Sequence, residues 1–190
     1  FMRGELVKNQ IDTQYVATTA DTETGQAYIL LQASGQNSII IQHGANFELT
    51  PADVQRATGL IQAADFVVAE LETPVAATAE AFKIAKAAGK VTILNPAPAQ
   101  KDLPEALLKN VDLIAPNETE SELITGIPVT DEASMRQSAA YYHQLGIRGV
   151  VITLGSKGVF HFAGWSGNPR PGFQGQSRRY HGSRRYLYRR

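Results

Sequence analysis

The sequence contains no cysteine among its 190 residues. Disulfides and thiolate metal sites are therefore excluded, and the composition fits a cytoplasmic protein. There is also no run of about 18 apolar residues, the length that a membrane-spanning helix requires. The beginning, FMRGELVKNQ, lacks the apolar stretch of a signal peptide. We therefore expect a soluble protein with no membrane partner.

Acidic residues are missing from the end of the sequence. Residues 1–162 hold all 18 Asp and Glu and 11 of the 18 Lys and Arg, a net charge of −7, whereas residues 163–190 hold seven Arg and no acid. Two segments of different composition thus add up to a net charge of zero. Arginine interleaved with tyrosine, as in RRYHGSRRYLYRR (178–190), is typical of an arm that binds nucleic acid or a membrane surface. That function is one interpretation of the tail.

Short β-branched runs alternate with helix-like segments between residues 37 and 162. The expected strands are 38–42, 66–71, 91–95, 112–117 and 149–155, and the expected helices are 50–64, 73–90, 103–110 and 131–147. This alternation predicts an α/β fold with a mostly parallel sheet and helices on both faces. Two helices begin with Thr-Pro, at Thr50 and Thr73, which predicts hydroxyl caps. Residues 15–41 predict two or three antiparallel strands outside the main sheet.

Ligand sites of such sheets lie beyond the carboxyl ends of the strands, where PNETE (116–120) follows one of them. Asn117 and Glu120 are three residues apart at the start of a helix, so both can face one point. An amide and a carboxylate there could position hydrated magnesium. The simpler alternative makes Asn117 a helix cap and the glutamates first-turn charges that complement the helix dipole.

A second candidate is TLGSKG (153–158), a glycine-containing turn between two apolar strands. Gly155 and Gly158 would let the backbone approach a phosphate, and Thr153 or Ser156 could donate hydrogen bonds. The spacing matches neither a Walker A motif nor the dinucleotide fingerprint. A plain hairpin turn is the equally open alternative.

Glu72 lies at the mouth of an apolar strand, where a carboxylate can accept hydrogen bonds from sugar hydroxyls. A solvated loop charge is the alternative, and Glu70 competes for the role. NPAPA (95–99) predicts a rigid, extended exit from the next strand, either as a site wall or as a simple strand end. The four histidines show no metal-binding spacing.

Over residues 13–162 the sequence resembles the ribokinase-like family of carbohydrate kinases. The resemblance is carried by five segments in this order: HGANFELTPADV, ELETP, NPAPA, VDLIAPNETESELITG and GVVITLGSKGVF. The spacing is nearer to the ribokinase branch than to the fructokinase or adenosine kinase branches. The resemblance implies transfer of the γ-phosphoryl group of ATP to the 5-hydroxyl of ribose, with magnesium and an activating potassium-type cation. It also implies a small β lid over the sugar and a homodimeric parent enzyme.

The resemblance assigns roles to residues by motif. Glu72 is similar to the family's sugar-binding glutamate and Asn117 to its nucleotide-contacting asparagine, while Glu120 completes an Asn-x-x-Glu element that acts on magnesium through water. The ATP-binding loop corresponds to Thr153, Leu154, Gly155, Ser156, Lys157 and Gly158. Catalysis would consist mostly of positioning and electrostatic stabilisation of the transferred group, with a base for the hydroxyl proton.

Two family elements have no counterpart in the sequence, namely the N-terminal sugar-binding portion and the C-terminal DTxAAGD motif with its catalytic aspartate. We therefore divide the chain into a helix remnant (1–12), the β lid and return to the sheet (13–45), a partial nucleotide- and sugar-binding core (46–162) and the basic tail (163–190). We expect this chain alone to be inactive, with no catalytic residue. A noncatalytic nucleotide-binding remnant is the alternative function.

The tail has a second interpretation that rests on the genetic code. Codons can be written for residues 173–190 that, read from their second nucleotide, encode FKVKAVDTTAAGDTFIG. This is the missing motif in its expected place, and the codons of Arg185 and Tyr186 would hold the aspartate. We therefore predict that a frameshift near residues 163–172 produced the tail, rather than selection for specific nucleic-acid binding.

Overall fold

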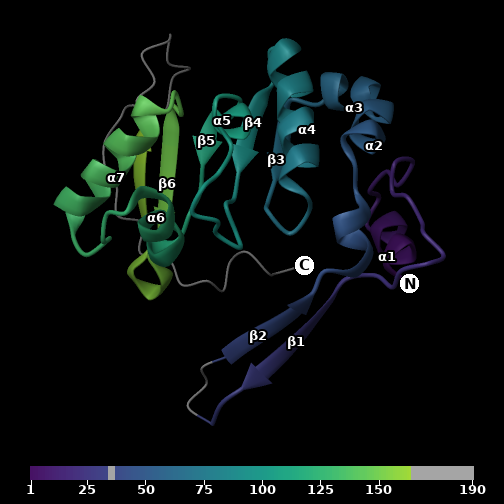
Figure 1. Cartoon of the computed structure of the whole chain (residues 1–190), viewed down its shortest axis with the longest axis horizontal. Helices are drawn as coiled ribbons and strands as arrows, with labels where there is room; N and C mark the ends of the chain where they lie inside the picture. The colour runs from purple at the N-terminus through teal and green to yellow at the C-terminus, as the bar shows by residue number, and fades with distance from the viewer. Residues whose placement is uncertain (34–36, 164–190) are drawn as a thin grey trace.

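The computed structural model describes residues 1–33 and 37–163. Their main feature is a five-stranded sheet in the order β3-β4-β5-β6-β7. The strands are Phe66–Ala69, Val91–Leu94, Leu113–Ile114, Gly149–Thr153 and Val159–Ala163. Strands β3 to β6 are parallel, and β7 returns antiparallel to β6. The expected α/β class with a mostly parallel sheet is confirmed (Figure 1).

Four helices connect these strands, namely α4 (Val75–Ala87), α5 (Glu105–Leu108), α6 (Glu118–Thr125) and α7 (Glu132–Gln144). Phe82 of α4 and Tyr142 of α7 are fully buried in one core cluster with the strand residues Leu94, Ile114 and Val150. These three are register partners, so they point to the same face of the sheet. In the described ranges the connecting helices pack on this face, whereas the sequence predicts helices on both.

The region expected to form one helix over residues 50–64 contains two. Thr50 accepts the backbone N–H of Asp53 and caps α2 (Pro51–Arg56), as expected, with proline in the first turn. The helix breaks at Ala57, and α3 (Thr58–Ala63) follows. The poor helix formers Thr58 and Gly59 lie directly after the break. The second predicted cap is wrong, because α4 begins after Pro74 without a side-chain cap.

A separate antiparallel hairpin is formed by β1 (Gln26–Leu31) and β2 (Asn37–Gln42). It projects away from the body of the molecule, to which the short 3-10 helix η1 (Gly44–Glu48) connects it (Figure 1). Every residue of β1 is exposed. Two strands of the predicted two or three are therefore present in residues 15–33 and 37–41. The chain begins with helix α1 (Met2–Lys8).

One buried carboxylate makes polar contacts at the amino ends of the strands β4, β5 and β6. Asp112, whose side chain is 4% exposed, pairs with Lys86 at 2.7 Å and with Arg148. Its other oxygen accepts the backbone N–H of Thr92 at 3.1 Å, and the backbone N–H of Asp112 donates to the hydroxyl oxygen of Thr92 at 2.9 Å. Burial opposes ionisation, but the hydrogen bonds from Arg148, Lys86 and Thr92 outweigh it, so the pKa of Asp112 lies below its usual value.

Of the basic tail (163–190), only Ala163 belongs to the described part of the chain, and residues 164–190 lie outside it. Among the described helices, none combines the length and the apolar character that crossing a membrane requires.

Candidate functional site

The predicted site residues follow the carboxyl ends of neighbouring parallel strands. Glu72 comes after β3, Asn117 after β5, and Thr153 is the last residue of β6. Parallel strands all end at the same edge of the sheet, so these residues share that edge. Strands lie about 4.8 Å apart. In the order β3-β4-β5-β6 this separates Glu72 from Asn117 by two strand spacings, roughly 10 Å, and places Thr153 next to Asn117.

Asn117 and Glu120 face each other at the start of α6, as their spacing predicts. Asn117 accepts the backbone N–H of Glu120 at 2.8 Å, and Glu120 accepts the backbone N–H of Asn117 at 2.8 Å and its side-chain amide at 2.7 Å. This reciprocal arrangement is a capping box. The alternative interpretation of PNETE as a helix start is thereby confirmed as local structure. It does not exclude a ligand-binding role for the same pair.

The capping box also determines the electrostatics of this corner. Both residues are half-buried, and burial raises the pKa of Glu120 even though the backbone N–H of Asn117 favours its ionised form. Within residues 1–33 and 37–163, no three acidic or histidine side chains gather as a metal cluster. Magnesium typically keeps several waters and binds through one or two carboxylates together with phosphate, and the carboxylate of Glu120 is available for such a role.

The predicted ATP loop is a hairpin turn between β6 and β7. Leu154 donates its backbone N–H to the carbonyl of Gly158 at 2.9 Å, and residues Gly155–Lys157 form the 3-10 turn η2. Gly158 has φ 98° and ψ −139°, a combination that side chains disfavour, so glycine is required there. The hairpin alternative is thus confirmed as structure. The ATP-binding interpretation concerns the same backbone and is compatible with it.

Contacts between main chains join the hairpin turn to the start of α6. Thr153 donates its backbone N–H to the carbonyl of Pro116 at 2.9 Å, and Asn117 and Thr153 form a parallel bridge. The Nζ atom of Lys157 lies 3.8 Å from the Oε1 atom of Glu118. The structure therefore brings PNETE and TLGSKG together into one corner. Sequence patterns did not predict the Lys157 to Glu118 contact, although a lysine in a turn and a glutamate in a first helical turn were visible.

Glu72 lies in a bend at the far side of this edge. Its backbone N–H donates to the carboxylate of Glu70. The preceding Leu71 donates to the carbonyl of Ala97 at 2.9 Å, which ties the segment after β3 to the NPAPA segment after β4. NPAPA therefore lies beside the segment that carries Glu72, and it contains a cis peptide bond between Ala97 and Pro98. Only long-range pairing could reveal this contact.

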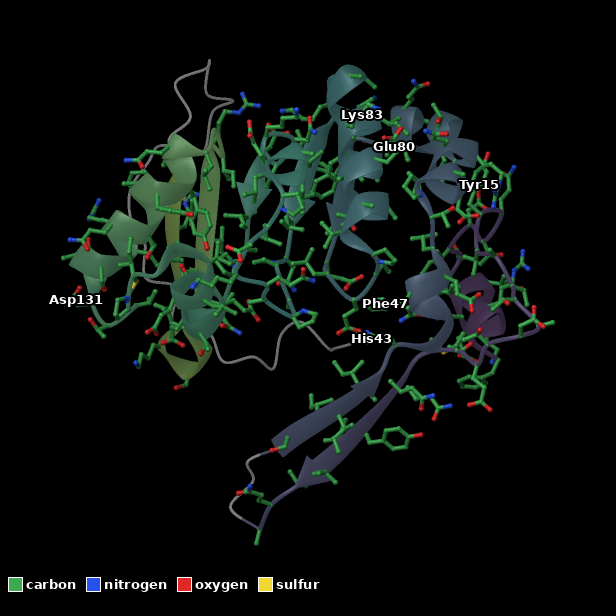
Figure 2. The ribbon with its side chains drawn as sticks, viewed as in Figure 1. Tyr15, His43, Phe47, Glu80, Lys83 and Asp131 are labelled. Carbon is green, nitrogen blue, oxygen red and sulfur yellow. The ribbon has the colours of Figure 1, made fainter. Side chains whose placement is uncertain are left out.

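The base of the hairpin β1–β2 is closely packed. His43 and Phe47 have ring centroids 4.1 Å apart, and Figure 2 shows them where the hairpin meets η1. Gly44 has φ 51°, and a side chain there would lie 2.3 Å from the carbonyl of Glu23. The hairpin, predicted as the lid, extends in Figure 1 on the side of the molecule to which the loops after β3 and β6 point.

A cavity of about 310 Å³ lies elsewhere, between residues 14–17 and the helices α2, α3 and α4. Tyr15, labelled in Figure 2, and Leu49, Val54 and Ile61 contribute to its walls. None of the predicted site residues lines it. The candidate site is therefore the strand-end corner and not this cavity.

Comparisons with known sequences place the chain among sugar kinases. The family model described as "pfkB family carbohydrate kinase" matches residues 1–177. The ribokinase of Staphylococcus aureus is 53% identical over 84% of this chain and 52% of its own length. The ribokinase of Haemophilus influenzae is 42% identical over 84% of this chain and 52% of its own length. The chain spans about half the length of these curated relatives.

Solved structures show the same similarity. The structure titled "Crystal Structure of Sa239" matches 96% of this chain and 57% of its own, with a TM-score of 0.86 and 45% identity. A ribokinase from Arabidopsis thaliana, solved in complex with ribose and ATP, matches 92% of this chain and 57% of its own, with a TM-score of 0.68 and 30% identity.

Proposed function

We propose, given that the chain belongs to the pfkB family of carbohydrate kinases, that it supplies the ATP-binding corner of a ribokinase, an enzyme that phosphorylates ribose to ribose 5-phosphate. The observation that carries this proposal is the junction of two family motifs, because the backbone of Thr153 pairs with Pro116 and Asn117. The similarity to a ribokinase solved with ribose and ATP supports both ligands.

The hairpin turn of residues 153–158 would hold the phosphates of ATP. Glycine at 155 and 158 leaves room for close backbone approach, and the positive φ values of 58° and 98° are accessible to glycine. Lys157 has a side chain that is 76% exposed, so its ammonium group can turn from Glu118 towards a phosphate. Asn117 would contact the nucleotide from the neighbouring strand end.

Glu120 would contribute to magnesium binding through water. A hydrated magnesium ion bridging the phosphates would neutralise charge that develops on the transferred group. The half-buried carboxylate of Glu120 is held in place by Asn117, so its orientation is fixed before any ligand binds. A potassium-type cation belongs to the proposal for the whole enzyme, without an assigned residue in this chain.

Glu72 would accept hydrogen bonds from ribose hydroxyls. Its distance from Asn117 of about two strand spacings leaves room for sugar and nucleotide to lie side by side along the strand ends. The hairpin β1–β2 would cover the sugar. Its exposed apolar side chains, including Ile29 and Ile39, would be shielded further in a homodimer that pairs two lids. A cytoplasmic location, where ATP is available, belongs to this proposal.

The chain alone would bind ATP without turning it over. The family's base is an aspartate after the ATP loop, whereas the last acidic residue of the printed sequence is Glu132. Without a proton acceptor beside the 5-hydroxyl, a contribution of about 10²- to 10⁴-fold to the rate is missing. This is the proposed origin of inactivity, and it makes nucleotide binding the measurable function of the polypeptide.

Isothermal titration with ATP and magnesium tests the proposal. We expect saturable binding that Lys157→Ala weakens by roughly three- to tenfold, the loss of one exposed charge contact. Lys83→Ala is the matched control, because Lys83 is 67% exposed and also pairs with a glutamate, Glu80, at 3.1 Å (Figure 2). Absence of binding at millimolar ATP, or equal weakening by both variants, would contradict the ATP site. Ribose-dependent ADP formation above a mock preparation would contradict the proposed inactivity.

A further inference from the structure

Three hydroxyl side chains are buried between α6 and α7. Ser121 of α6 and Ser138 and Tyr142 of α7 are each 0% exposed. The two helices pack against each other beside β6 (Figure 1), and their residues Ile124 and Ala139 belong to the same buried core cluster. Among the described residues, none of the three hydroxyls has a hydrogen-bond partner. Buried polar groups in folded proteins are nearly always hydrogen-bonded, so these hydroxyls require an explanation.

The helices themselves do not satisfy the two serines. A serine or threonine inside a helix often donates its hydroxyl to the carbonyl one turn earlier. Thr125 of α6 does so, to the carbonyl of Ser121 at 2.7 Å. The hydroxyls of Ser121 and Ser138 make no such bond within the described part of the chain. Their partner therefore has to lie in the space between the two helices.

The three hydroxyls lie close to one another in that space. Ser138 and Tyr142 are four residues apart on α7, so they share one face, and a long helical side chain leans over the preceding turn, here towards Ser138. Burial raises the pKa of Tyr142 to about 12, while the hydroxyl of Ser121 opposes this rise. Ser121 therefore lies beside the phenol oxygen, although the two hydroxyls lack direct hydrogen-bonding geometry. Polar groups in that relation are often bridged by ordered water.

We propose that Ser121, Ser138 and Tyr142, together called the hydroxyl site, bind one internal water molecule that links α7 to the first turns of α6. Each hydroxyl can donate and accept, so the site can supply the about three hydrogen bonds that a buried water typically makes. Ser121 directly follows Glu120, which forms the capping box with Asn117. The water thus holds the start of α6 in place, and Tyr142 is a positioning residue for this corner. The value of that positioning for ATP rests on the proposed function, whereas the water site does not.

Two other states of the hydroxyl site make different predictions. Hydroxyls that stay unpaired would each cost stability, so that removing one would stabilise the chain. Hydroxyls that bond directly to one another would make each removal destabilising, but the site would contain no long-lived water. The water itself and the sign of the change in stability therefore distinguish the three states.

Magnetic relaxation dispersion of the oxygen isotope in water detects the bound molecule in the full chain. The method counts long-lived internal waters and is insensitive to hydroxyl protons. The triple variant Ser121→Ala/Ser138→Ala/Tyr142→Phe offers no polar partner, and apolar sites stay dry. We expect it to contain one long-lived water fewer than the unaltered chain. Replacing all of the hydroxyls by apolar groups is compatible with folding, because no member of the site is left unpaired.

Urea unfolding gives the sign of the change in stability. Tyr142→Phe should raise the equilibrium constant for unfolding roughly fivefold, the effect of one lost hydrogen bond, and Ser138→Ala should act similarly. Because both hydroxyls bond the same water, the double variant should change the constant by less than the product of the single effects. Tyr141→Phe is the matched control, since it makes the same chemical change at the neighbouring, half-buried position. Its effect should stay below about twofold.

Hydrogen exchange tests the positioning of α6 separately from overall stability. The backbone N–H of Glu120 donates to the side chain of Asn117 at 2.8 Å and reports on the start of the helix. The backbone N–H of the fully buried Phe82 in α4 is the reference. We expect Tyr142→Phe to accelerate the exchange of Glu120 at least about threefold more than that of Phe82, because α6 opens locally. A role in overall stability alone would accelerate both equally.

Three outcomes would overturn the proposal. One is an equal number of long-lived waters in the triple variant and the unaltered chain. Another is a Tyr142→Phe variant that is as stable as the unaltered chain or more stable. The third, equal acceleration of exchange at Glu120 and Phe82, would remove the positioning role. None of these measurements uses ATP, so a failure of ATP to bind would refute the proposed function and leave these results unchanged.

Discussion

Replacing Asp112 by alanine should destabilise the chain more than any surface ion-pair mutation. The substitution leaves the backbone N–H of Thr92 in a buried position without its acceptor, a penalty of about 1–3 kcal/mol. The hydroxyl of Thr92 keeps a partner, because it donates to the carbonyl of Asn110 at 2.5 Å. Lys86 and Arg148 are 31% and 49% exposed and can turn to water, so the lost ion pairs add about 0–1 kcal/mol.

The expected loss is therefore about 1–4 kcal/mol, compared with the roughly 5–15 kcal/mol that stabilises a typical domain. Equilibrium urea unfolding, followed by circular dichroism, measures it. Glu132→Ala is the control, since Glu132 pairs with Arg136 at 2.7 Å but both side chains are nearly half exposed. That variant should change stability by less than about 1 kcal/mol. Equal losses in the two variants would refute the argument from burial.

The pH dependence of the same group provides an independent check. The pKa of Asp112 is lowered in the folded state, so its contribution is present above the unfolded-state value of about 4 and is lost as pH falls through the folded value. Urea midpoints of the unaltered chain should therefore fall below pH ~4. Asp112→Asn, which has no carboxyl group to titrate, should show a shallower fall. Parallel profiles would show that other carboxylates dominate.

Three further predictions concern other parts of the chain. Burial raises the pKa of Tyr142 to about 12, so its stabilising contribution should be complete below the usual value of about 10 and decline as pH rises towards the folded value. Absorbance titration with Tyr142→Phe as reference tests this, and an ordinary phenol titration would contradict it. Gly158→Ala should cost about 1–3 kcal/mol in urea unfolding because of its backbone angles, and an unchanged midpoint would contradict the strain. DNA sequencing through the codon of Arg190 should reveal the aspartate-bearing motif in the shifted frame, and codons that forbid this reading would restore the basic arm as genuine sequence.

The sequence alone determined the α/β class and the locations of the site motifs. Apolar runs and their spacing identify the strands, because a buried parallel strand has few alternatives to β-branched and aliphatic residues. The pairing of Asn117 with Glu120 was also predictable, since residues three apart at a helix start are neighbours whatever surrounds them. Local chemistry decides such features before any tertiary contact forms.

Boundaries and contacts between distant segments were decided by the tertiary structure. The strand expected over residues 112–117 is reduced to Leu113–Ile114, because pairing extends only where both neighbours are in register. The uncapped start of α4 likewise differs from local preference. The attachment of the hairpin turn to Pro116 depends on strand order. Strand order joins residues far apart in the chain, and no local pattern specifies it.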